Sequence, residues 1–373
     1  MSDITLILLA AGNSSRFGLP VKKQWLRIDH EPLWQFVANS FESTALFRNI
    51  IITSHKEEVP FMQGFCNYRV VEGGETRQQS LKNALEYVTT PYVLVSDIAR
   101  ACVDSKLITL LIAEKAKADV IVPTLSVSDT VVFENNTIDR DKVKRIQTPQ
   151  LSKTDVIKKA LLTAEEFTDE SSAIVANGGT RHFVQGSDDA HKITYLHDLT
   201  QLPCIKAPSS ATLVGNGFDV HAFEAGREMM LGGVKIDVDY GFKAHSDGDV
   251  AIHALIDALL GAAGLGDIGM LFPDNDSAYK NIDSKKLLET TVLRLHQFGL
   301  QIVNADLTIA AEAPRLSNYK QAMRTTLAAV LQIPTSRMNV KATTTEKLGF
   351  IGRKEGVGVM ASVTLNYYDW TQK

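Results

Sequence analysis

The chain contains 373 residues, 45% of them hydrophobic, and carries a formal net charge of -4 at pH 7. This length exceeds one typical domain and predicts two domains with buried cores, while the slight acidity gives no electrostatic support for a nucleic acid or anionic membrane partner. The sequence shows neither a basic, apolar signal segment nor a stretch of the roughly 20 apolar residues that span a bilayer, so we expect a cytoplasmic protein.

The first half of the sequence alternates strand patterns with helical patterns. Buried strands are predicted at residues 4–11, 50–54, 92–96 and 120–123, and a helix at residues 76–88 lies between two of them. This alternation is typical of a mainly parallel sheet that helices cover on both faces. We therefore predict an α/β fold for the first half, with a Rossmann-like, doubly wound sheet.

A stretch containing proline and serine separates the two halves. Residues 201–216 include Leu-Pro-Cys-Ile-Lys-Ala-Pro-Ser-Ser-Ala and interrupt the periodic pattern. We therefore expect one domain at residues 1–205, a linker at 206–210 and a second domain at 211–373. The second domain mixes helices and strands in a pattern that predicts an α+β or α/β fold. Helices are expected at 250–260, at 284–298 and after Pro314, and strands at 302–310, 339–345 and 357–366.

A loop rich in small residues follows the first predicted strand. It runs from Leu9 to Gly18, and Lys22-Lys23-Gln24 comes soon after. The loop lacks the glycines of a dinucleotide-binding motif and the lysine of a P-loop, but it lies at the carboxyl end of a strand, where ligands bind in doubly wound sheets. Its backbone amides could hold a triphosphate, with Arg16 and Lys23 stabilising charge in a transition state. A basic surface turn is the alternative.

A second polar cluster belongs to the same half. Glu-Gly-Gly-Glu-Thr-Arg-Gln-Gln-Ser at residues 72–80 precedes a predicted helix, and Asp97 ends a predicted strand. A carboxylate at that position can hold Mg²⁺ together with triphosphate oxygens and water. Simple pairing of Asp97 with Arg100 is the alternative interpretation.

The three cysteines, Cys66, Cys102 and Cys204, are far apart in the sequence and form no C-x-x-C pair. Their spacing indicates no disulfide framework, which is consistent with a reducing cytoplasm. Any metal site must therefore use other ligands.

Such a site is predicted in the second half. Asp219 and His221 alternate in an apolar strand pattern, so both side chains leave the same face, and His253 lies on a helix capped by residues 246–249. One carboxylate and two imidazoles with an open fourth position are typical of catalytic zinc. A core histidine is the alternative for His253. Asp257 could orient the His253 imidazole or serve as an ordinary capping or solvated aspartate.

Short motifs are spread over nearly the whole first half. They are Leu9–Gly12, Arg16, Lys23–Gln24, Gly73–Gly74, Arg77, Ser80, Ser96–Arg100, Asp129–Thr130, Thr148–Gln150 and Phe167–Glu170. These motifs resemble those of the cytidylyltransferases that join CTP to 2-C-methyl-D-erythritol 4-phosphate. Ile98 and Ala101 depart from the resemblance, since that family usually has alanine and proline at these positions.

This resemblance implies roles for residues of the first half. Arg16 and Lys23 would stabilise the pentacovalent phosphorus of cytidylyl transfer, and Asp97 would bind Mg²⁺. The residues implied to bind cytidine are Gly74, Arg77 and Ser80, and those implied to bind the methylerythritol phosphate are Thr130, Arg140 and Lys192.

The second half carries longer motifs. They are Gly217–His221, Ala244–Asp249, Gly264–Gly269, Phe272–Asp274 and Val340–Arg353. These motifs resemble those of the 2-C-methyl-D-erythritol 2,4-cyclodiphosphate synthases, so the whole chain resembles the fused, bifunctional form of the two enzymes. In such a synthase, one phosphate of a CDP-bearing substrate attacks the β-phosphorus of its own diphosphate and expels CMP.

The ligand set and the resemblance together assign residues of the second half. Zinc or another divalent cation is expected on Asp219, His221 and His253, and Mg²⁺ on Glu346. His245 and Thr344 would donate hydrogen bonds to the developing charge. The expected substrate contacts are Ser246, Thr343, Thr345, Phe350 and Arg353. Those expected around the methylerythritol are Asp267, Gly269, Phe272 and Asp276, and those expected at the cytosine are Ala311 and Pro314. Pro314 is expected near the start of a helix.

The resemblance also bears on assembly. Cyclodiphosphate synthases of this kind form trimers and the cytidylyltransferases form dimers, which implies a homo-oligomer, either a hexamer or a trimer. Two functional alternatives are a protein in which one half is a non-catalytic scaffold, and a zinc phosphohydrolase fused to a sugar nucleotidyltransferase.

Overall fold

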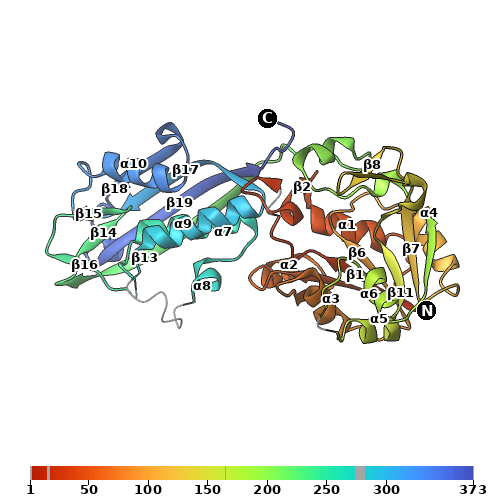
Figure 1. The fold of residues 1–373 in the computed structure, drawn as a ribbon. Helices are drawn as coiled ribbons and strands as arrows, with labels where there is room; N and C mark the ends of the chain where they lie inside the picture. Colours follow the sequence, from red (N-terminus) through yellow and green to blue (C-terminus); the bar gives the residue numbers. More distant parts are fainter. Residues whose placement is uncertain (1, 15–16, 164, 245, 274–281, 373) are drawn as a thin grey trace. The chain divides into compact units, whose positions relative to one another are not determined.

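The computed structural model describes residues 2–14, 17–163, 165–244, 246–273 and 282–372. The chain forms two compact units (Figure 1): one runs to Ala207 and includes the tail from Trp370, and the other runs from Pro208 to Asp369. The tail is held by the indole N–H of Trp370, which donates to the carbonyl oxygen of Arg27 at 2.8 Å. Within the described ranges, no helix is both long and apolar enough to cross a membrane.

The first unit is built on an eight-stranded sheet. Its strands are β1 (Ile4–Leu9), β4 (Asn49–Ser54), β5 (Arg69–Glu72), β6 (Tyr92–Asp97), β7 (Val120–Leu125), β10 (Arg145–Ile146), β11 (Gln150–Lys153) and β12 (Arg181–Gln185). The order is β10-β7-β11-β6-β1-β4-β5, with β12 beside β7. Strands β1, β4, β5 and β6 pair in parallel, and β11 runs antiparallel between β6 and β7. The predicted α/β fold is confirmed.

Helices and short elements surround this sheet. The helices are α1 (Leu33–Glu42), α2 (Val59–Phe65), α3 (Arg77–Leu85), α4 (Ser105–Ala113), α5 (Thr154–Ala160) and α6 (Glu170–Ala176). Two hairpins are formed by β2 (Arg27–Ile28) with β3 (Glu31–Pro32) and by β8 (Val131–Phe133) with β9 (Asn136–Ile138). The 3-10 turns are η2 (Lys23–Trp25), η3 (Arg140–Lys142), η4 (Asp188–Ala190) and η5 (Leu196–Gln201). Ile7 and Val95 pack in one core with α3, α5 and α6. Leu6 and Leu94, which point to the opposite face, are also fully buried. Both faces of the sheet are therefore covered.

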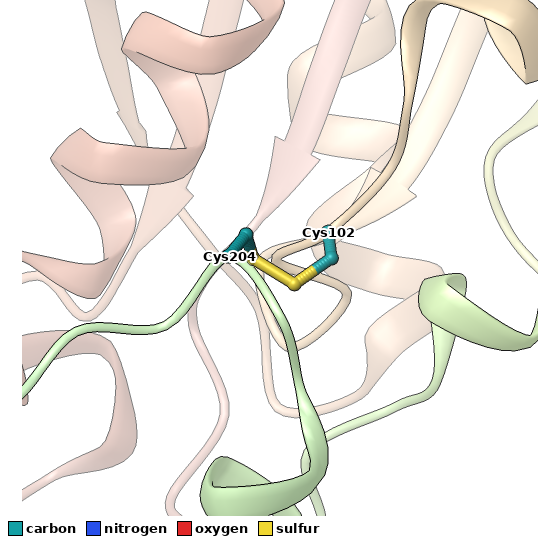
Figure 2. Close-up of a disulfide and its surroundings, with 2 residues drawn as sticks. All are labelled: Cys102 and Cys204. Carbon is teal, nitrogen blue, oxygen red and sulfur yellow. A yellow bond between two sulfur atoms is a disulfide. The ribbon is translucent and has the colours of Figure 1, made fainter.

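A disulfide joins Cys102 to Cys204 (Figure 2). The expectation of no disulfide was wrong, because the fold brings together residues that lie 102 positions apart in the sequence, a relationship that spacing does not reveal. Their Cα atoms are 5.6 Å apart, a usual separation for a disulfide. In the chain-entropy model, closing a loop of this length stabilises the folded state by about 4–5 kcal/mol. Cys66 is a free thiol.

The second unit has a five-stranded sheet in the order β16-β13-β19-β17-β18. These strands are β13 (Leu213–Ala225), β16 (Tyr240–Phe242), β17 (Leu300–Ala310), β18 (Met338–Thr343) and β19 (Gly356–Tyr367); β14 (Met229–Leu231) and β15 (Val234–Ile236) form a hairpin. The helical elements are α7 (Val250–Ala263), α8 (Ile268–Leu271), α9 (Ser284–Gln297), α10 (Lys320–Val330), η7 (Thr335–Arg337) and α11 (Gly349–Gly352). Burial alternates along β17, which is typical of a sheet with helices on one face.

Two glycines let α7 lie directly on β13. A Cβ atom on Gly217 would collide with the carbonyl oxygen of Ala254, and one on Gly215 with that of Ala258. The helix is capped at its start by Asp249, whose buried carboxylate accepts from the amides of residues 251 and 252. The close approach of helix and strand brings the histidine of α7 near the polar residues of β13.

The expected helix start at Pro314 was wrong. Helix α10 begins at Lys320, and residues 311–316 form an irregular segment whose first amide, on Ala311, donates to the carbonyl oxygen of Thr343 at 2.9 Å. Pairing with Thr343, the last residue of β18, takes precedence over the local preference of proline for a first helical turn.

Candidate active sites

The first site lies at the carboxyl ends of β1 and β6. A cavity of about 360 Å³ opens there, and its wall includes the loop of residues 9–14, as expected for a doubly wound sheet. The cavity also brings together side chains and backbone from distant parts of the chain. They are Lys23, Gly74, Arg77, Ser80, Asp97 and Lys192.

Asp97 is the acidic centre of this cavity. Its two carboxylate oxygens accept from Arg77 Nε at 3.1 Å and from Lys192 Nζ at 2.7 Å. Burial alone would raise the pKa of Asp97, but the two cations outweigh it and hold the pKa well below its usual range. Asp97 is therefore ionised, and its side chain pairs with Arg77 and Lys192 rather than with Arg100 as the alternative interpretation required.

Glu170 was not predicted to take part in this site. It is the first residue of α6, its side chain is fully buried, and its Oε1 accepts from Arg77 Nη1 at 2.6 Å. Burial raises the pKa of Glu170, although the charge of Arg77 acts in the opposite direction. Arg77 is thus held between the carboxylates of Asp97 and Glu170. The signal in the sequence was the position of Glu170 in the motif that begins at Phe167, to which no role was assigned.

Lys23 projects towards the segment that carries Lys192. Its Nζ donates to the carbonyl oxygen of Ile193 at 2.6 Å. Ser80 and Gly74 also line the cavity, and Ser80 Oγ accepts from the amide of Gly74 at 3.0 Å. Lys23, expected to stabilise the transition state, and Gly74 and Ser80, expected to bind the cytidine, therefore line the same cavity.

The turn after Asp97 is well held despite its unusual residues. Ile98 and Ala101 are buried, Arg100 Nε donates to Thr148 Oγ1 at 2.9 Å, and Arg100 Nη1 donates to the carbonyl oxygen of Ala190 at 2.6 Å. The departures from the family pattern are therefore accommodated by burial and hydrogen bonding.

Other predicted residues of the first unit are placed differently. Thr130 and Arg140 are exposed and are not among the residues that line the cavity; Arg140 Nη1 donates to the carbonyl oxygen of Ser128 at 2.6 Å. Arg16 lies outside the described residues.

The second site is a cluster of three candidate metal ligands. Asp219 and His221 leave the same face of β13, and His253 comes from α7; one ligand atom from each lies within 4.8 Å of the others. Asp219 Oδ2 is 3.1 Å from His221 Nε2 and 3.4 Å from His253 Nδ1. The donor set of one carboxylate and two imidazoles fits a divalent cation such as zinc. It is the only cluster of this kind among the residues that the structure describes.

Neighbouring groups orient the two imidazoles. His221 Nδ1 contacts the carbonyl oxygen of Gly248 at 2.8 Å, which favours a proton on Nδ1 and leaves Nε2 directed at the cluster. His253 Nε2 lies 3.3 Å from Ser246 Oγ and 3.1 Å from Ser284 Oγ, so its Nδ1 faces Asp219. Sequence reasoning missed Ser284, which lies 31 residues beyond His253 and has no motif around it.

The electrostatics of this cluster depend on the carboxylate. Burial would raise the pKa of Asp219, but its contacts with the two histidines outweigh burial and lower that pKa. Burial would likewise lower the pKa of His221, but Asp219 outweighs it and raises that pKa. Asp257 accepts from the amide of Ile268, the first residue of α8, at 2.8 Å. This contact agrees with the interpretation of Asp257 as a capping residue.

The remaining predicted residues of the second unit lie in loops and short helices. Asp267 caps α8, in which Gly269 lies, and Phe272 is buried just beyond it. His245 and Asp276 lie outside the described residues. Thr343, Thr344, Thr345 and Glu346 end β18 and form the following turn, while Phe350 and Arg353 come from or follow α11.

The turn after β18 is exposed. Thr344 Oγ1 donates to Glu346 Oε1 at 3.1 Å, and Arg353 pairs with Glu355. Glu346 therefore offers an accessible carboxylate, the type of ligand that Mg²⁺ shares with substrate phosphates and water. In the first unit, the carboxylate that fits Mg²⁺ is that of Asp97, which is largely buried but ionised and lines the cavity.

Comparisons with known proteins assign each part of the chain to a family. A family model described as 2-C-methyl-D-erythritol 4-phosphate cytidylyltransferase matches residues 4–205, and one described as the YgbB family matches residues 212–366. A protein from Sulfurimonas denitrificans named bifunctional enzyme IspD/IspF is 62% identical over 372 residues, which cover 100% of this chain and 96% of that protein. A relative of the same name from Nitratiruptor sp. is 55% identical, with 100% of both chains covered.

A solved structure extends this likeness to three dimensions. The bifunctional IspDF from Campylobacter jejuni is 49% identical, covers 100% of both chains and matches with a TM-score of 0.88. The two family models, the full-length relatives and the shared fold lead to one conclusion. This chain belongs to the bifunctional IspD/IspF family of enzymes, with a cytidylyltransferase in its first part and a cyclodiphosphate synthase in its second.

Proposed function

We propose that the two reactions of this family take place at the two sites described above. The first unit would join CTP to 2-C-methyl-D-erythritol 4-phosphate, giving 4-diphosphocytidyl-2-C-methyl-D-erythritol and diphosphate. The second would convert 4-diphosphocytidyl-2-C-methyl-D-erythritol 2-phosphate to 2-C-methyl-D-erythritol 2,4-cyclodiphosphate and CMP. The convergence of Lys23, Asp97 and Lys192 on one cavity supports the first assignment, and the cluster around Asp219 supports the second.

In the first reaction, the substrate phosphate attacks the α-phosphorus of CTP and diphosphate leaves. Lys23 borders the cavity and supplies a positive charge for the oxygens that become more negative as the new bond forms. Lys192, paired with Asp97, holds the attacking phosphate, and Arg77 and Ser80 bind the cytidine. Asp97 would hold Mg²⁺, which when bound neutralises the triphosphate.

Arg16, Thr130 and Arg140 complete the proposed first site. The support for these three residues is the family motif, since Arg16 is not described and the other two lie away from the cavity wall. We propose that Arg16 acts beside Lys23 on the transition state, and that Thr130 and Arg140 contact the methylerythritol phosphate.

In the second reaction, one phosphate of the substrate attacks the β-phosphorus of the diphosphate and CMP leaves. Asp219, His221 and His253 would hold zinc or a similar cation, and Glu346 would hold Mg²⁺; these ions, when bound, polarise the diphosphate oxygens. Thr344 donates to the charge that develops on phosphorus oxygens, as we propose for His245 from the family motif. The hydrogen bonds to Gly248 and Ser246 keep the two imidazoles in one orientation while the substrate folds.

The other assigned residues of the second unit surround this chemistry. We propose that Ala311 and Pro314 receive the cytosine, that Asp267, Gly269 and Phe272 line the methylerythritol pocket together with Asp276, and that Thr343, Thr345, Phe350 and Arg353 contact the phosphates. The support is the family motif together with the exposure of the turn after β18.

We further propose that the chain forms a homo-oligomer, a trimer or a hexamer. One face of β13 and β19 exposes the apolar side chains of Val214, Phe218 and Met360, which are between 61% and 64% exposed in the single chain. Copies of the chain that pack through this face would cover it. Hairpin β8–β9 exposes Val132 and Phe133, which supports a second contact through the first unit and hence a hexamer. Light scattering on the purified chain measures the oligomeric state. A monomer that retains cyclase activity would contradict this proposal.

Product analysis tests the proposed reactions. The purified chain is given each half's substrate in a separate incubation, and the products are identified by mass spectrometry. We expect 4-diphosphocytidyl-2-C-methyl-D-erythritol from the first and the cyclic diphosphate with CMP from the second. An open-chain product from the second incubation would indicate a phosphohydrolase instead.

Since both substrates are phosphorylated metabolites, we also propose a cytoplasmic location, which subcellular fractionation tests.

A further inference from the structure

The turn that follows β18 has an unusual backbone. Glu346 and Lys347 are consecutive residues other than glycine, and both have positive φ angles, of 51° and 65°. Side chains with a Cβ atom rarely adopt this left-handed region, and two in succession are rarer still. The turn therefore requires contacts from elsewhere in the fold to keep this shape.

Glu312 supplies such contacts. A single carboxylate oxygen of Glu312, Oε1, accepts from the backbone amide of Thr345 at 3.1 Å and from that of Lys347 at 2.9 Å. These two amides lie on either side of Glu346, so the carboxylate holds the backbone on both flanks of that residue. Glu312 is partly buried and comes from the irregular segment that precedes α10.

Further hydrogen bonds join the same two segments. The amide of Ala311 donates to the carbonyl oxygen of Thr343 at 2.9 Å, immediately before the contacts of Glu312. Within the turn, the amide of Leu348 donates to the carbonyl oxygen of Thr345 at 2.9 Å and Thr345 Oγ1 donates to the carbonyl oxygen of Leu348 at 2.8 Å. The turn is thus closed on itself and fastened to residues 311 and 312.

We propose that Glu312 is a positioning residue of the cyclase site: by holding the amides of Thr345 and Lys347, it fixes the Glu346 carboxylate and the Thr344 hydroxyl in the orientation that the reaction needs. The proposal rests on the roles proposed above for Glu346 and Thr344. Glu312 acts on backbone amides alone in these contacts, so it needs no contact with the substrate or a metal ion.

The same arrangement couples two parts of the substrate site. Residues 311–314, proposed to receive the cytosine, and Glu346, proposed to bind Mg²⁺, are joined by one carboxylate. A nucleotide that orders residues 311–314 therefore also favours the conformation of the turn in which Glu346 binds Mg²⁺. By thermodynamic linkage, Mg²⁺ bound to Glu346 in turn strengthens nucleotide binding. Loss of Glu312 should weaken both effects together.

Two substitutions at one position distinguish this role from general stability. Glu312→Gln keeps an oxygen where Oε1 lies and can still accept from both amides, so it should retain activity within about threefold. Glu312→Ala removes the acceptor and should lower cyclase kcat and raise the Mg²⁺ concentration for half-maximal activity by about 10-fold or more, as is typical when a group that orients a metal ligand is lost. Glu289→Ala, on the exposed surface of α9, is the matched control.

Hydrogen exchange provides a readout independent of activity. In metal-free protein, mass spectrometry of peptides covering residues 343–349 should show faster exchange of the Thr345 and Lys347 amides in Glu312→Ala, and wild-type exchange in Glu312→Gln and Glu289→Ala. Unchanged cytidylyl transfer and unchanged zinc content would show that the Glu312→Ala chain is folded.

The outcomes separate this proposal from the one on which it rests. A wild-type rate of hydrogen exchange in Glu312→Ala would contradict the claim that Glu312 restrains the turn. Fast exchange with wild-type kcat and Mg²⁺ dependence would overturn the link to catalysis, provided that Glu346→Ala is impaired. If Glu346→Ala itself has normal Mg²⁺ dependence, the role of Glu346 is wrong, and the catalytic part of the present proposal falls with it.

Discussion

Cys102 and Cys204 are joined by a disulfide that ties the turn after Asp97 to the end of the first unit. The same two stretches of chain are also held by a hydrogen bond from the amide of Ile193 to the carbonyl oxygen of Ala99, at 2.8 Å. Asp97 and Lys192, which pair across the cavity, belong to these stretches. The covalent bond therefore restrains the parts of the backbone from which two of the candidate site residues project.

We expect that replacing both cysteines, Cys102→Ser with Cys204→Ser, lowers the free energy of unfolding of the first unit by about 4–5 kcal/mol, because the unfolded chain regains the freedom of a long loop. Tryptophan fluorescence during urea unfolding measures this change. Trp25, Trp34 and Trp370, the three tryptophans of the chain, all belong to the first unit, so the signal reports on that unit.

Cys66→Ser is the control for this prediction, because Cys66 is a free thiol and its replacement breaks no cross-link. It should leave the unfolding free energy within about 0.5 kcal/mol of wild type. A thiol assay on the denatured wild-type chain should find one thiol before reduction and three after it. Three thiols before reduction would contradict the disulfide.

Lys23→Ala should lower kcat of cytidylyl transfer by about 10²-fold or more and change the KM for CTP much less. The reason is that Lys23 is proposed to stabilise charge that exists only in the transition state. Steady-state kinetics with both substrates measure the two constants.

Lys22→Ala is a matched control for Lys23→Ala. The Lys22 ammonium pairs with the buried Glu58, and Lys22 is not among the residues that line the cavity. Its loss should reduce stability and leave kcat close to wild type. A Lys23→Ala enzyme with normal kcat and only a raised KM would show that Lys23 serves ground-state binding.

His253→Ala should abolish binding of zinc to the second unit and reduce cyclase activity to background, because a site with three protein ligands loses much of its affinity with one of them. Cytidylyl transfer should remain at the wild-type rate, since the cluster lies in the other unit. Metal analysis and separate assays of the two reactions check this. His296→Ala, a change on α9 outside the cluster, should keep zinc and both activities; normal zinc in the His253→Ala chain would contradict the assigned ligand set.

Asp169→Asn should make the first unit less stable at pH 7 by about 1 kcal/mol. Asp169 is the N-cap of α6 and accepts from the amides of Ser171 and Ser172 at 2.9 and 3.2 Å. Burial would raise its pKa, but these and further hydrogen bonds outweigh burial and lower the pKa. Because the pKa is lower in the folded state, the carboxylate stabilises the unit above the ordinary pKa of an aspartate and loses this effect as the pH falls through the lowered value.

Urea unfolding by tryptophan fluorescence at several pH values tests this. The difference between wild type and Asp169→Asn should be largest near neutral pH and shrink as the pH is lowered past about 4. Thr168→Ala, a neighbouring change that leaves the cap intact, should show no such pH-dependent difference. A constant difference at every pH would mean that the charge of Asp169 does not contribute.

Local patterns in the sequence determined much of this protein. The period of apolar residues predicted β1, β4, β6, β7 and α3 of the first unit, and α7, α9, β17, β18 and β19 of the second. The alternation of Asp219 and His221 predicted that both side chains leave one face of a strand. The position of Asp97 after a strand predicted its place at the ligand-binding edge of the sheet. Each of these predictions depends on residues only a few positions apart.

Contacts between distant parts of the chain could be decided only by the tertiary structure. The disulfide between Cys102 and Cys204, the clasp of Arg77 between Asp97 and Glu170, and the carboxylate of Glu312 on the turn around Glu346 join residues from 20 to 102 positions apart. The start of α10 was also mispredicted, because Ala311 pairs with a residue that follows much later. Periodicity and capping preferences act within a few residues, whereas these contacts depend on how whole elements pack, and the sequence of either segment alone carries no record of its partner.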